Sequence, residues 1–416
     1  MSGGRRRLLA VSWEMPPLSG PRAVQVSRTL KHLVPLGWES SVVCFGARSA
    51  RYFPDQDLSR RLAMGDGVRV VPVPSREEDL FFRALWRVAP RLKGRPDEKW
   101  VWIGAAVDAA RALASDTRFD AVATFAQPWS DHLIGRRLRR ALRLPWVAHF
   151  SDPWVDSPYH FPRWQRQVWA PMERAVVEEA DALVFVNTQT ADCVMRKYPA
   201  AWRQKVHVVP HGFDVDMLPT VRETPAAGGP LRIVYTGRFY EGWRTPEHLL
   251  KAIAALTAID RRSLELVIVG TIDAESSRLA ANLGLHDVVS FRGRLSWAES
   301  MAAATSADVL LVVDAPSDVN LFLPSKLVEY LPLGKPILGL TPANGASADV
   351  LRALDYPIAP PDAAPAIERV LATLVAAKQS GALRASPRHH DVAARYDIRQ
   401  TTEAFASVLA ACVRPQ

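Results

Sequence analysis

Short apolar runs rich in β-branched residues alternate with longer amphipathic segments in the first half of the chain. The runs that predict strands are 7–13, 40–45, 68–73, 119–125, 146–150, 181–186 and 205–210. Apolar residues at helical spacing fall between them, at 21–34, 103–114, 130–142 and 164–179. Because strands that alternate with helices form parallel sheets covered on both faces, this half predicts a doubly wound domain.

The pattern breaks at residues 218–230, "LPTVRETPAAGGP", which are rich in Pro, Gly and Ala and show no periodicity. Such a composition is typical of a linker or of a crossing between domains. Alternation then restarts, with strands predicted at 231–237, 264–270, 288–293, 307–313 and 335–340. We therefore expect an α/β protein with two facing Rossmann-like, doubly wound domains. Ligands bind such sheets at the carboxyl ends of their strands, so we expect the active site in the cleft between the domains.

The break also sets the expected domain boundaries. The N-terminal domain is predicted to cover residues 1–218 and the C-terminal domain residues 231–388. The last segment, 389–416, has a helical pattern and is expected to pack back on the N-terminal domain.

Composition narrows the class of protein. Of 416 residues, 48% are hydrophobic and 23% charged, as in an ordinary globular protein, and no apolar run approaches the ~18 residues of a membrane span. The apolar stretch "LLAVSW" behind Arg5–Arg7 is too short for the core of a signal peptide. Three widely separated cysteines form no metal-ligand pair and indicate reduced thiols in a cytoplasmic protein. The net charge of +9 indicates a mild preference for anionic partners.

Two common nucleotide-binding classes lack their motifs here. A dinucleotide dehydrogenase would carry G-x-G-x-x-G directly after a first strand, but "EMPPLSGPRAV" has a single glycine, Gly20. The second domain opens with "YTGRFYEGWR", which does not fit the motif either. No G-x-x-x-x-G-K-[ST] loop occurs in the chain, so NAD enzymes and P-loop ATPases are poor candidates.

One short segment has the composition of a phosphate site. "FLPSKLVEYLPLGKPIL", 322–338, predicts a helix with Pro324 at its start, followed by a buried strand. Free N–H groups at a helix start favour an anion, and Lys326 adds a full positive charge beside them. Glu329 lies one turn further on, where its carboxylate can bind hydroxyl groups. The alternative is an ordinary helix-to-strand turn of an α/β domain.

A second basic segment follows the first strand of the C-terminal domain. "YTGRFYEGWR" ends that strand at Gly237 and places Arg238 and Arg244 on either side of a loop. Guanidinium groups bind phosphate oxygens in pairs, which suits a pyrophosphate. The alternative is that both arginines are solvated surface residues.

Two loops of the N-terminal domain carry candidate residues. "MPPLSGPRAV" places Gly20 at a loop-to-helix junction, where a ligand can approach the backbone closely. "VAHFSDPWVDSPY" ends a strand on His149 and Asp152. A carboxylate at a strand end is a candidate base or hydrogen-bond acceptor, although Asp152 also suits a cap of the turn before Pro153.

Taken in order, these segments resemble a known family. "PP…G" follows the first strand, "FSDPW" and "VPHGFD" come next, and "YTGRF…R", "LVIVG…VSFRG" and "LPSKLVEYLPLGKPIL" follow in the second domain. This order resembles family-4 type glycosyltransferases of the GT-B fold over nearly the whole chain. It is most similar to the branch that builds bacterial polysaccharides and other cell-envelope glycans.

The resemblance implies roles for individual residues. Arg238 and Arg244 match the basic pair for the diphosphate of the donor, and Gly20 matches the glycine that faces this diphosphate. Glu329 matches the acidic residue that accepts both ribose hydroxyls. The remaining donor-binding positions implied are the helix start and the "FRGR" loop whose backbone holds the base, namely Ser325, Lys326, the N–H of Leu327 and Arg292. The resemblance further implies retention of anomeric configuration, no metal and no cofactor, with a UDP- or GDP-linked sugar as donor substrate.

One position departs from the family pattern of Glu, seven residues, Glu. Counting back from Glu329, the first position is Leu321, which cannot bind a sugar hydroxyl. Asp318 and Asn320 lie close enough along the chain to replace it as contacts to the transferred sugar.

The expected function is therefore transfer of a hexose-type sugar from a nucleoside diphosphate to a hydroxyl of a glycan or lipid-linked acceptor. Asp152, or less favourably His149, would orient or deprotonate that acceptor. The alternatives are a sugar-nucleotide 2-epimerase on the same fold and a non-catalytic, glycosyltransferase-like subunit. Nucleic-acid binding is disfavoured, because the basic residues are dispersed and no recognition motif accompanies them.

A membrane contact is a separate expectation. Segment 78–107, "EDLFFRALWRVAPRLKGRPDEKWVWIGAAV", sets bulky apolar residues among arginines and lysine. Such a segment can lie in the headgroup region of an anionic membrane, or it can pack its apolar residues into the domain core. We expect a cytoplasmic protein with peripheral contact to the inner face of the plasma membrane.

Overall fold

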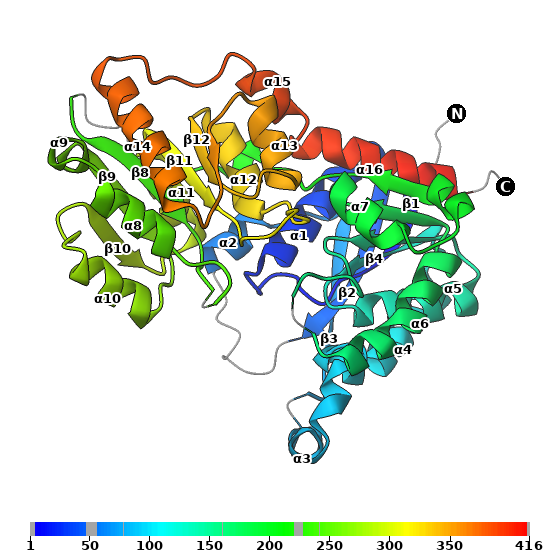
Figure 1. The fold of residues 1–416 in the computed structure, drawn as a ribbon. Coiled ribbons are helices and arrows are strands. Elements are labelled where there is room, and N and C mark those ends of the chain that lie inside the picture. Colours follow the sequence, from blue (N-terminus) through cyan, green and yellow to red (C-terminus); the bar gives the residue numbers. More distant parts are fainter. Residues whose placement is uncertain are drawn as a thin grey trace. The chain divides into compact units, whose positions relative to one another are not determined.

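The computed structural model describes residues 5–46, 56–77, 79–159, 161–219, 228–240 and 242–413. The chain forms two compact units, shown in Figure 1. The first unit holds Met1–Gly212 together with Ile398–Gln416, and the second holds Phe213–Asp397. Most of the segment predicted as a linker, 218–230, lies outside the described residues.

The first unit contains a seven-stranded parallel sheet in the order β3-β2-β1-β4-β5-β6-β7. Its strands are β1 (Arg6–Val11), β2 (Trp38–Gly46), β3 (Val68–Pro74), β4 (Ala121–Ala126), β5 (Trp146–Phe150), β6 (Ala182–Phe185) and β7 (Val206–Val208). Its helices are α1 (Pro21–Leu33), α2 (Gln56–Arg61), α3 (Leu80–Val88), α4 (Ile103–Asp116), α5 (Ser130–Leu142), α6 (Arg163–Glu179), α7 (Thr188–Met195) and α16 (Ile398–Cys412).

The second unit contains a six-stranded parallel sheet in the order β10-β9-β8-β11-β12-β13. Its strands are β8 (Leu231–Thr236), β9 (Leu264–Val269), β10 (Val289–Gly293), β11 (Val309–Val313), β12 (Ile337–Leu340) and β13 (Ile358–Ala359). Its helices are α8 (Glu247–Ala255), α9 (Ala258–Arg262), α10 (Ala274–Asn282), α11 (Trp297–Thr305), α12 (Ser325–Tyr330), α13 (Ala346–Ala353), α14 (Ala364–Gln379) and α15 (His389–Ala394).

Both sheets are buried on their two faces, which explains the nearly continuous apolar runs of their strands. In β11, Leu311 and Val313 pack into the core on one face, whereas Leu310 and Val312 pack into the core on the other. Helices α4 to α7 cover one face of the first sheet, and α1 and α16 cover the other. Two doubly wound domains of parallel strands, as predicted, are therefore confirmed.

The last predicted segment, 389–416, is divided between the units. Helix α15 packs Val392 and Ala393 into the core of the second unit, and α16 buries Phe405 and Leu409 in the core of the first. The chain thus returns to the first unit at Ile398, later than residue 389. The first crossing comes after Gly212, earlier than residue 218.

The strand orders define one position in each sheet where ligands bind. Both sheets contain the order 3-2-1-4-5-6, in which consecutive connections leave the first strand in opposite directions. The switch points lie between β1 and β4 in the first unit and between β8 and β11 in the second. Residues that follow these strands are therefore the first candidates for a site.

Candidate functional site

The loops after β8 and β9 meet through two glycines. Gly237, directly after β8, has φ +135° and donates its N–H to Val269 at 2.7 Å. Gly270, directly after β9, has φ +139°, and the carbonyl oxygen of Gly237 occupies the place where a side chain at Gly270 would begin. Only glycine permits this close backbone contact.

A buried lysine lies beside these glycines. The ammonium of Lys326, on α12, sits 3.7 Å from the centre of the Tyr235 ring at the end of β8. Its Nζ is inaccessible to solvent and has no hydrogen-bond partner within the described part of the chain. Burial lowers the pKa of Lys326 well below its usual range, and the nearby charge of Arg244 adds to this effect. Burial thus disfavours the charged form of Lys326, and an anion bound beside its Nζ would favour that form again.

Two arginines extend this positive charge. Arg238 and Arg244 both lie against the Tyr240 ring, with guanidinium carbons 5.1 and 4.8 Å from its centre. Backbone hydrogen bonds of 2.8 and 2.9 Å between Tyr240 and Arg244 close the loop that carries them. Arg244 Nη2 donates to the carbonyl of Arg238 at 2.8 Å, while its Nε is buried without a partner among the described residues. The loop therefore brings together the two guanidinium groups that the sequence predicts as a phosphate site.

A carboxyl group that was not predicted lies in the same region. Asp314 follows β11, so it lies at the other side of the switch point, and only 5% of it is exposed. Burial raises its pKa, whereas the nearby charges of Arg244 and Lys326 act in the opposite direction. Its position as the first polar residue after the run "VLLVV" could have identified it.

The side chain of Asn320, which was expected to contact the transferred sugar, is engaged in hydrogen bonds within the loop. Its Nδ2 lies within hydrogen-bonding distance of Asp314 Oδ2, the Phe322 carbonyl and Ser347 Oγ, at 2.8 to 3.1 Å. Its Oδ1 accepts from the N–H of Phe322 at 3.0 Å, and the residue is 5% exposed. Asn320 thus holds the loop before α12, whereas Asp318 is exposed and remains accessible to a ligand.

The start of α12 also differs from expectation. The helix has only six residues, and the N–H of Leu327 donates to the carbonyl of Pro324 at 3.0 Å. This N–H was expected to bind phosphate, but it is already used inside the first turn. Ser325 and Glu329 are both half-buried and lie on the same short helix as Lys326.

Arg292 lies apart from this helix. It is exposed near the end of β10, directly before Gly293. Its backbone is therefore at the carboxyl edge of the same sheet, two strands away from β8.

In the first unit, Gly20 lies directly before α1 and is covered by a carboxylate. The side chain of Glu14 occupies the place where a side chain at Gly20 would begin. Oε2 of Glu14 is buried without a hydrogen-bond partner within the described part of the chain, and burial raises the pKa of this carboxyl. The burial of Glu14 and its contact with Gly20 were not predictable, because the Pro-rich loop between β1 and α1 has no periodicity that shows which side chains are buried.

His149 lies in β5 and Asp152 lies two residues after its end, and the buried Arg22 contacts the first and acts on the second through its charge. Arg22 Nη2 lies 3.0 Å from Nδ1 of His149 and 3.2 Å from its carbonyl oxygen. Asp152 Oδ2 accepts from Nε2 of Gln127 at 3.0 Å. Burial raises the pKa of Asp152 to about 6, although the charge of Arg22 acts in the opposite direction.

His149 is less suited to act as a base. Burial, together with the charges of Arg22 and His211, lowers its pKa well below the usual range. Because the guanidinium can only donate, Nδ1 of His149 is the acceptor in their contact. The lone pair that a base would use is therefore already engaged.

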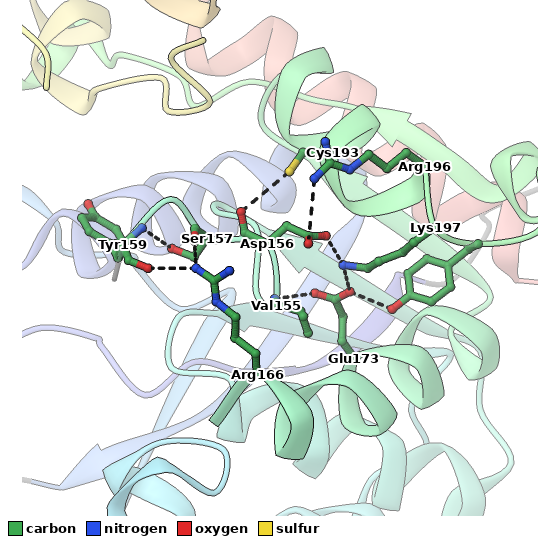
Figure 2. Close-up of polar contacts among 10 residues, drawn as sticks. Val155, Asp156, Ser157, Tyr159, Arg166, Glu173, Cys193, Arg196 and Lys197 are labelled. Carbon is green, nitrogen blue, oxygen red and sulfur yellow. Dashed lines mark hydrogen bonds and ion pairs between the residues drawn. The ribbon is translucent and has the colours of Figure 1, made fainter. Parts of the chain in front are cut away.

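A network of polar side chains holds the loop after Asp152 (Figure 2). Glu173 on α6 is fully buried and accepts from the N–H of Val155 at 2.8 Å and from the Tyr198 hydroxyl at 2.7 Å. Lys197 pairs with Glu173 at 2.7 Å and also with Asp156. This network was not predictable from the sequence, because Glu173 lies in a helix with the amphipathic pattern of many others.

Metal-binding clusters and membrane-spanning helices are both absent from the described residues. These residues contain no group of three or more His, Cys, Asp or Glu side chains that could hold a metal ion. None of the helices they form is both long enough and apolar enough to cross a membrane.

Two Rossmann-like domains of parallel strands are the architecture of the GT-B class of glycosyltransferases. Residues 22–212 match the family model of the glycosyl transferase 4-like domain, and residues 230–376 match that of glycosyl transferases group 1. The chain belongs to the family-4 type GT-B glycosyltransferases, as its sequence motifs predicted. A comparison with curated proteins finds no match.

Solved structures with the same fold cover almost the whole chain. HepE from Anabaena, solved with UDP and glucose, is 15% identical with a TM-score of 0.69, and the match covers 98% of this chain and 100% of that one. Sucrose-phosphate synthase from Thermosynechococcus elongatus is 17% identical with a TM-score of 0.71, over 98% and 99% of the two chains. The lipopolysaccharide outer core galactosyltransferase WaaB is 16% identical with a TM-score of 0.61, over 97% and 99%.

Proposed function

We propose that this glycosyltransferase moves a hexose-type sugar from a UDP- or GDP-linked donor to a hydroxyl of a glycan or lipid-linked acceptor, with retention of anomeric configuration. The observation that carries the proposal is the buried, unpartnered ammonium of Lys326, which lies beside Arg244 in the described part of the chain. HepE, which shares the fold, was solved with UDP and glucose. The name of WaaB, another structure with this fold, describes it as a galactosyltransferase of the lipopolysaccharide outer core.

The leaving group determines the chemistry that the second unit supplies. Cleavage of the bond between sugar and phosphate develops negative charge on the diphosphate. Lys326, Arg238 and Arg244 would stabilise this charge, because their positive groups are already held in position before the reaction. Glu329 would accept the ribose hydroxyls, and Asp318 is the exposed carboxylate left to contact the transferred sugar.

The first unit would supply the acceptor side of the reaction. With a pKa of about 6, Asp152 is mostly ionised at neutral pH and can accept a proton or a hydrogen bond from the acceptor hydroxyl. The hydrogen bond from Gln127 orients one of its carboxylate oxygens. His149 would position Arg22 rather than act as the base.

We further propose that the reaction needs neither a metal nor a cofactor, because protein cations already meet the charge of the donor. Transfer should therefore survive an excess of EDTA. Complete loss of transfer with EDTA, restored by magnesium or manganese, would show that the phosphate site has been misassigned.

Nucleotide binding tests the proposal directly. UDP or GDP, screened beside ADP and dTDP, should raise the melting temperature, because a ligand that binds only the native state stabilises it. Arg244→Ala should weaken that nucleotide about ten- to a hundredfold in calorimetric titration, from the loss of a charged hydrogen bond. Arg369→Ala, an exposed arginine on α14, is the matched control and should bind like the parent. Parental affinity in both Arg238→Ala and Arg244→Ala would place the phosphate site elsewhere.

Incubation with sugar nucleotides alone separates the alternative functions. A 2-epimerase would interconvert two sugar nucleotides without an acceptor, whereas a transferase releases nucleoside diphosphate when an acceptor is added. Nucleotide binding without turnover under either condition would identify a non-catalytic subunit.

We propose that transfer takes place in the cytoplasm, at the inner face of the plasma membrane, where a lipid-linked acceptor is met.

A further inference from the structure

Helix α3 (Leu80–Val88) has a face that nothing in its own unit covers among the described residues. None of its residues is buried, and Leu80, Phe81 and Val88 are 79%, 65% and 86% exposed. With 3.6 residues per turn, these three residues and Ala84 share one apolar stripe about 100° wide. In Figure 1, α3 projects away from the sheet of its own unit, beyond β3.

The opposite face of α3 explains why the stripe points outward. Phe82 packs edge-on against Trp100, with ring centres 5.8 Å apart, and its ring is covered by Arg76 at 5.1 Å. Trp86 lies 6.4 Å from Phe82 and is covered by the ammonium of Lys93 at 5.0 Å. Because these aromatic rings attach the helix to its own unit, the exposed stripe is the face left over for another surface.

Positive charge borders the stripe. Arg83 and Arg87 are exposed, lie one turn apart on its flank, and form no ion pair within the described part of the chain. The turn Pro90–Gly94 after the helix adds the exposed Arg91 and Lys93.

Described carboxylates near the helix are already paired. Asp79 pairs with Arg76 at 3.0 Å, and Glu77 and Glu98 pair with Lys99 at 2.8 and 3.1 Å. The described residues around the apolar stripe therefore carry a net positive charge.

We infer that α3 and the turn Pro90–Gly94 dock this protein on an anionic lipid surface. Leu80, Phe81 and Val88 enter the boundary between headgroups and acyl chains, and the flanking cations contact lipid phosphates. A nine-residue helix offers far less surface than the roughly 1,200–2,000 Å² that a stable protein interface buries, so a bilayer is the better match. The inference deepens the proposed function, since it rests on a lipid-linked acceptor and names the surface that brings the enzyme to it.

Flotation of the full-length protein with lipid vesicles tests the inference. The protein should float with vesicles of phosphatidylcholine and phosphatidylglycerol at low salt, and less with phosphatidylcholine alone or at high salt. Leu80→Ser with Val88→Ser should reduce the partition coefficient by roughly tenfold or more. Arg83→Gln with Arg87→Gln should reduce it by about fivefold for each charge removed.

Matched controls lie away from α3. Ile259→Ser replaces a residue on α9 that is 69% exposed, and Arg118→Gln with Arg137→Gln removes two exposed arginines of the first unit. These controls should float like the parent. Absence of parental flotation, equal flotation of the α3 variants, or an equal loss in the controls would overturn the inference.

The nucleotide thermal shift keeps this test separate from that of the proposed function. The α3 variants should keep the parental shift with UDP or GDP, because α3 belongs to the other unit from Lys326. Normal flotation without any nucleotide shift would refute the donor site alone. A normal shift without flotation would refute the docking surface alone.

Discussion

Replacing the buried lysine should have opposite effects on stability and on ligand binding. In Lys326→Met, an unbranched side chain of similar length keeps the packing against Tyr235 but removes the ammonium. Because Nζ has no acceptor within the described part of the chain, the empty protein should become more stable. Because the same ammonium meets the diphosphate, donor affinity should fall.

The size of each effect follows from the surroundings of Lys326. An unsatisfied buried donor costs about 1–3 kcal/mol, and the variant recovers this cost. It loses the attraction to the Tyr235 ring, about 0.5–2 kcal/mol, so the net gain should be about 1 kcal/mol. For a domain of this size, that gain raises the melting temperature by roughly 2–4 °C. The lost charged hydrogen bond should weaken nucleoside diphosphate binding about ten- to a hundredfold.

Two measurements on the same preparations give the change in stability and the change in nucleotide affinity. Differential scanning calorimetry of the ligand-free protein gives the stability change, and titration with UDP or GDP gives the affinity change. Lys251→Met is the matched control, since Lys251 lies on α8 in the same unit and pairs with Glu247 near the surface. This control should lose at most about 0.5 kcal/mol and bind nucleotide like the parent.

Either measurement can contradict the proposed role of Lys326. If ligand-free Lys326→Met melts several degrees lower than the parent, the ammonium has an acceptor in the empty site. If the variant binds the nucleotide as tightly as the parent, the diphosphate does not lie at Lys326.

Three other changes test the rest of the structure. Since the pKa of Asp152 is raised to about 6, its carboxylate is lost below that pH, so transfer should show an acidic limb near pH 6 that Arg22→Gln moves to higher pH. Glu173→Ala should lower the free energy of unfolding in urea by about 3 kcal/mol, because it leaves three donors of the loop network without their buried carboxylate. Gly270→Ala should lower it by at least about 2 kcal/mol, since a Cβ there collides with backbone and φ is positive.

Each change has a control and an opposing result. Asp152→Asn should lose turnover but keep nucleotide binding, and normal turnover would reduce Asp152 to a turn cap. Glu178→Ala, exposed on the same helix as Glu173, should change stability by less than about 0.5 kcal/mol. Gly284 also has positive φ, but no described atom lies within 4 Å of the place where its Cβ would be, so Gly284→Ala should cost less than Gly270→Ala. Equal costs at these two glycines would show that backbone contact is not the cause.

The fold was predictable because each strand carries its own signature. Runs such as 231–237 and 307–313 are buried on both faces, so their composition alone marks them as central parallel strands. β13 (Ile358–Ala359) was not predicted, because two residues at a sheet edge have no periodicity to detect. The return of the chain at Ile398 depends on which core accepts Phe405, and a helical pattern does not specify its partner.

The candidate site was only partly predictable, for a related reason. Residue type pointed to the cations of the site, together with a position after a predicted strand for Arg238 and Arg244 and at the start of a predicted helix for Lys326. The hydrogen bonds of Asn320 were not accessible in this way, because Asp314 and Ser347 approach it only in the folded chain.

Contacts from uncharged side chains determine how the charged residues of the site are positioned. Asn320 binds both the N–H and the carbonyl of Phe322, and so fixes the chain just before the helix that carries Lys326. Tyr235 supplies an aromatic face for the amino group of Lys326, which has no hydrogen-bond acceptor in the described part of the chain, so the lysine is held in place without an ion-pair partner. A carboxylate in the place of Tyr235 would stabilise the empty protein and compete with a diphosphate. An oriented but unpaired cation is what a leaving-group site requires, because its charge is then free to respond when the diphosphate departs.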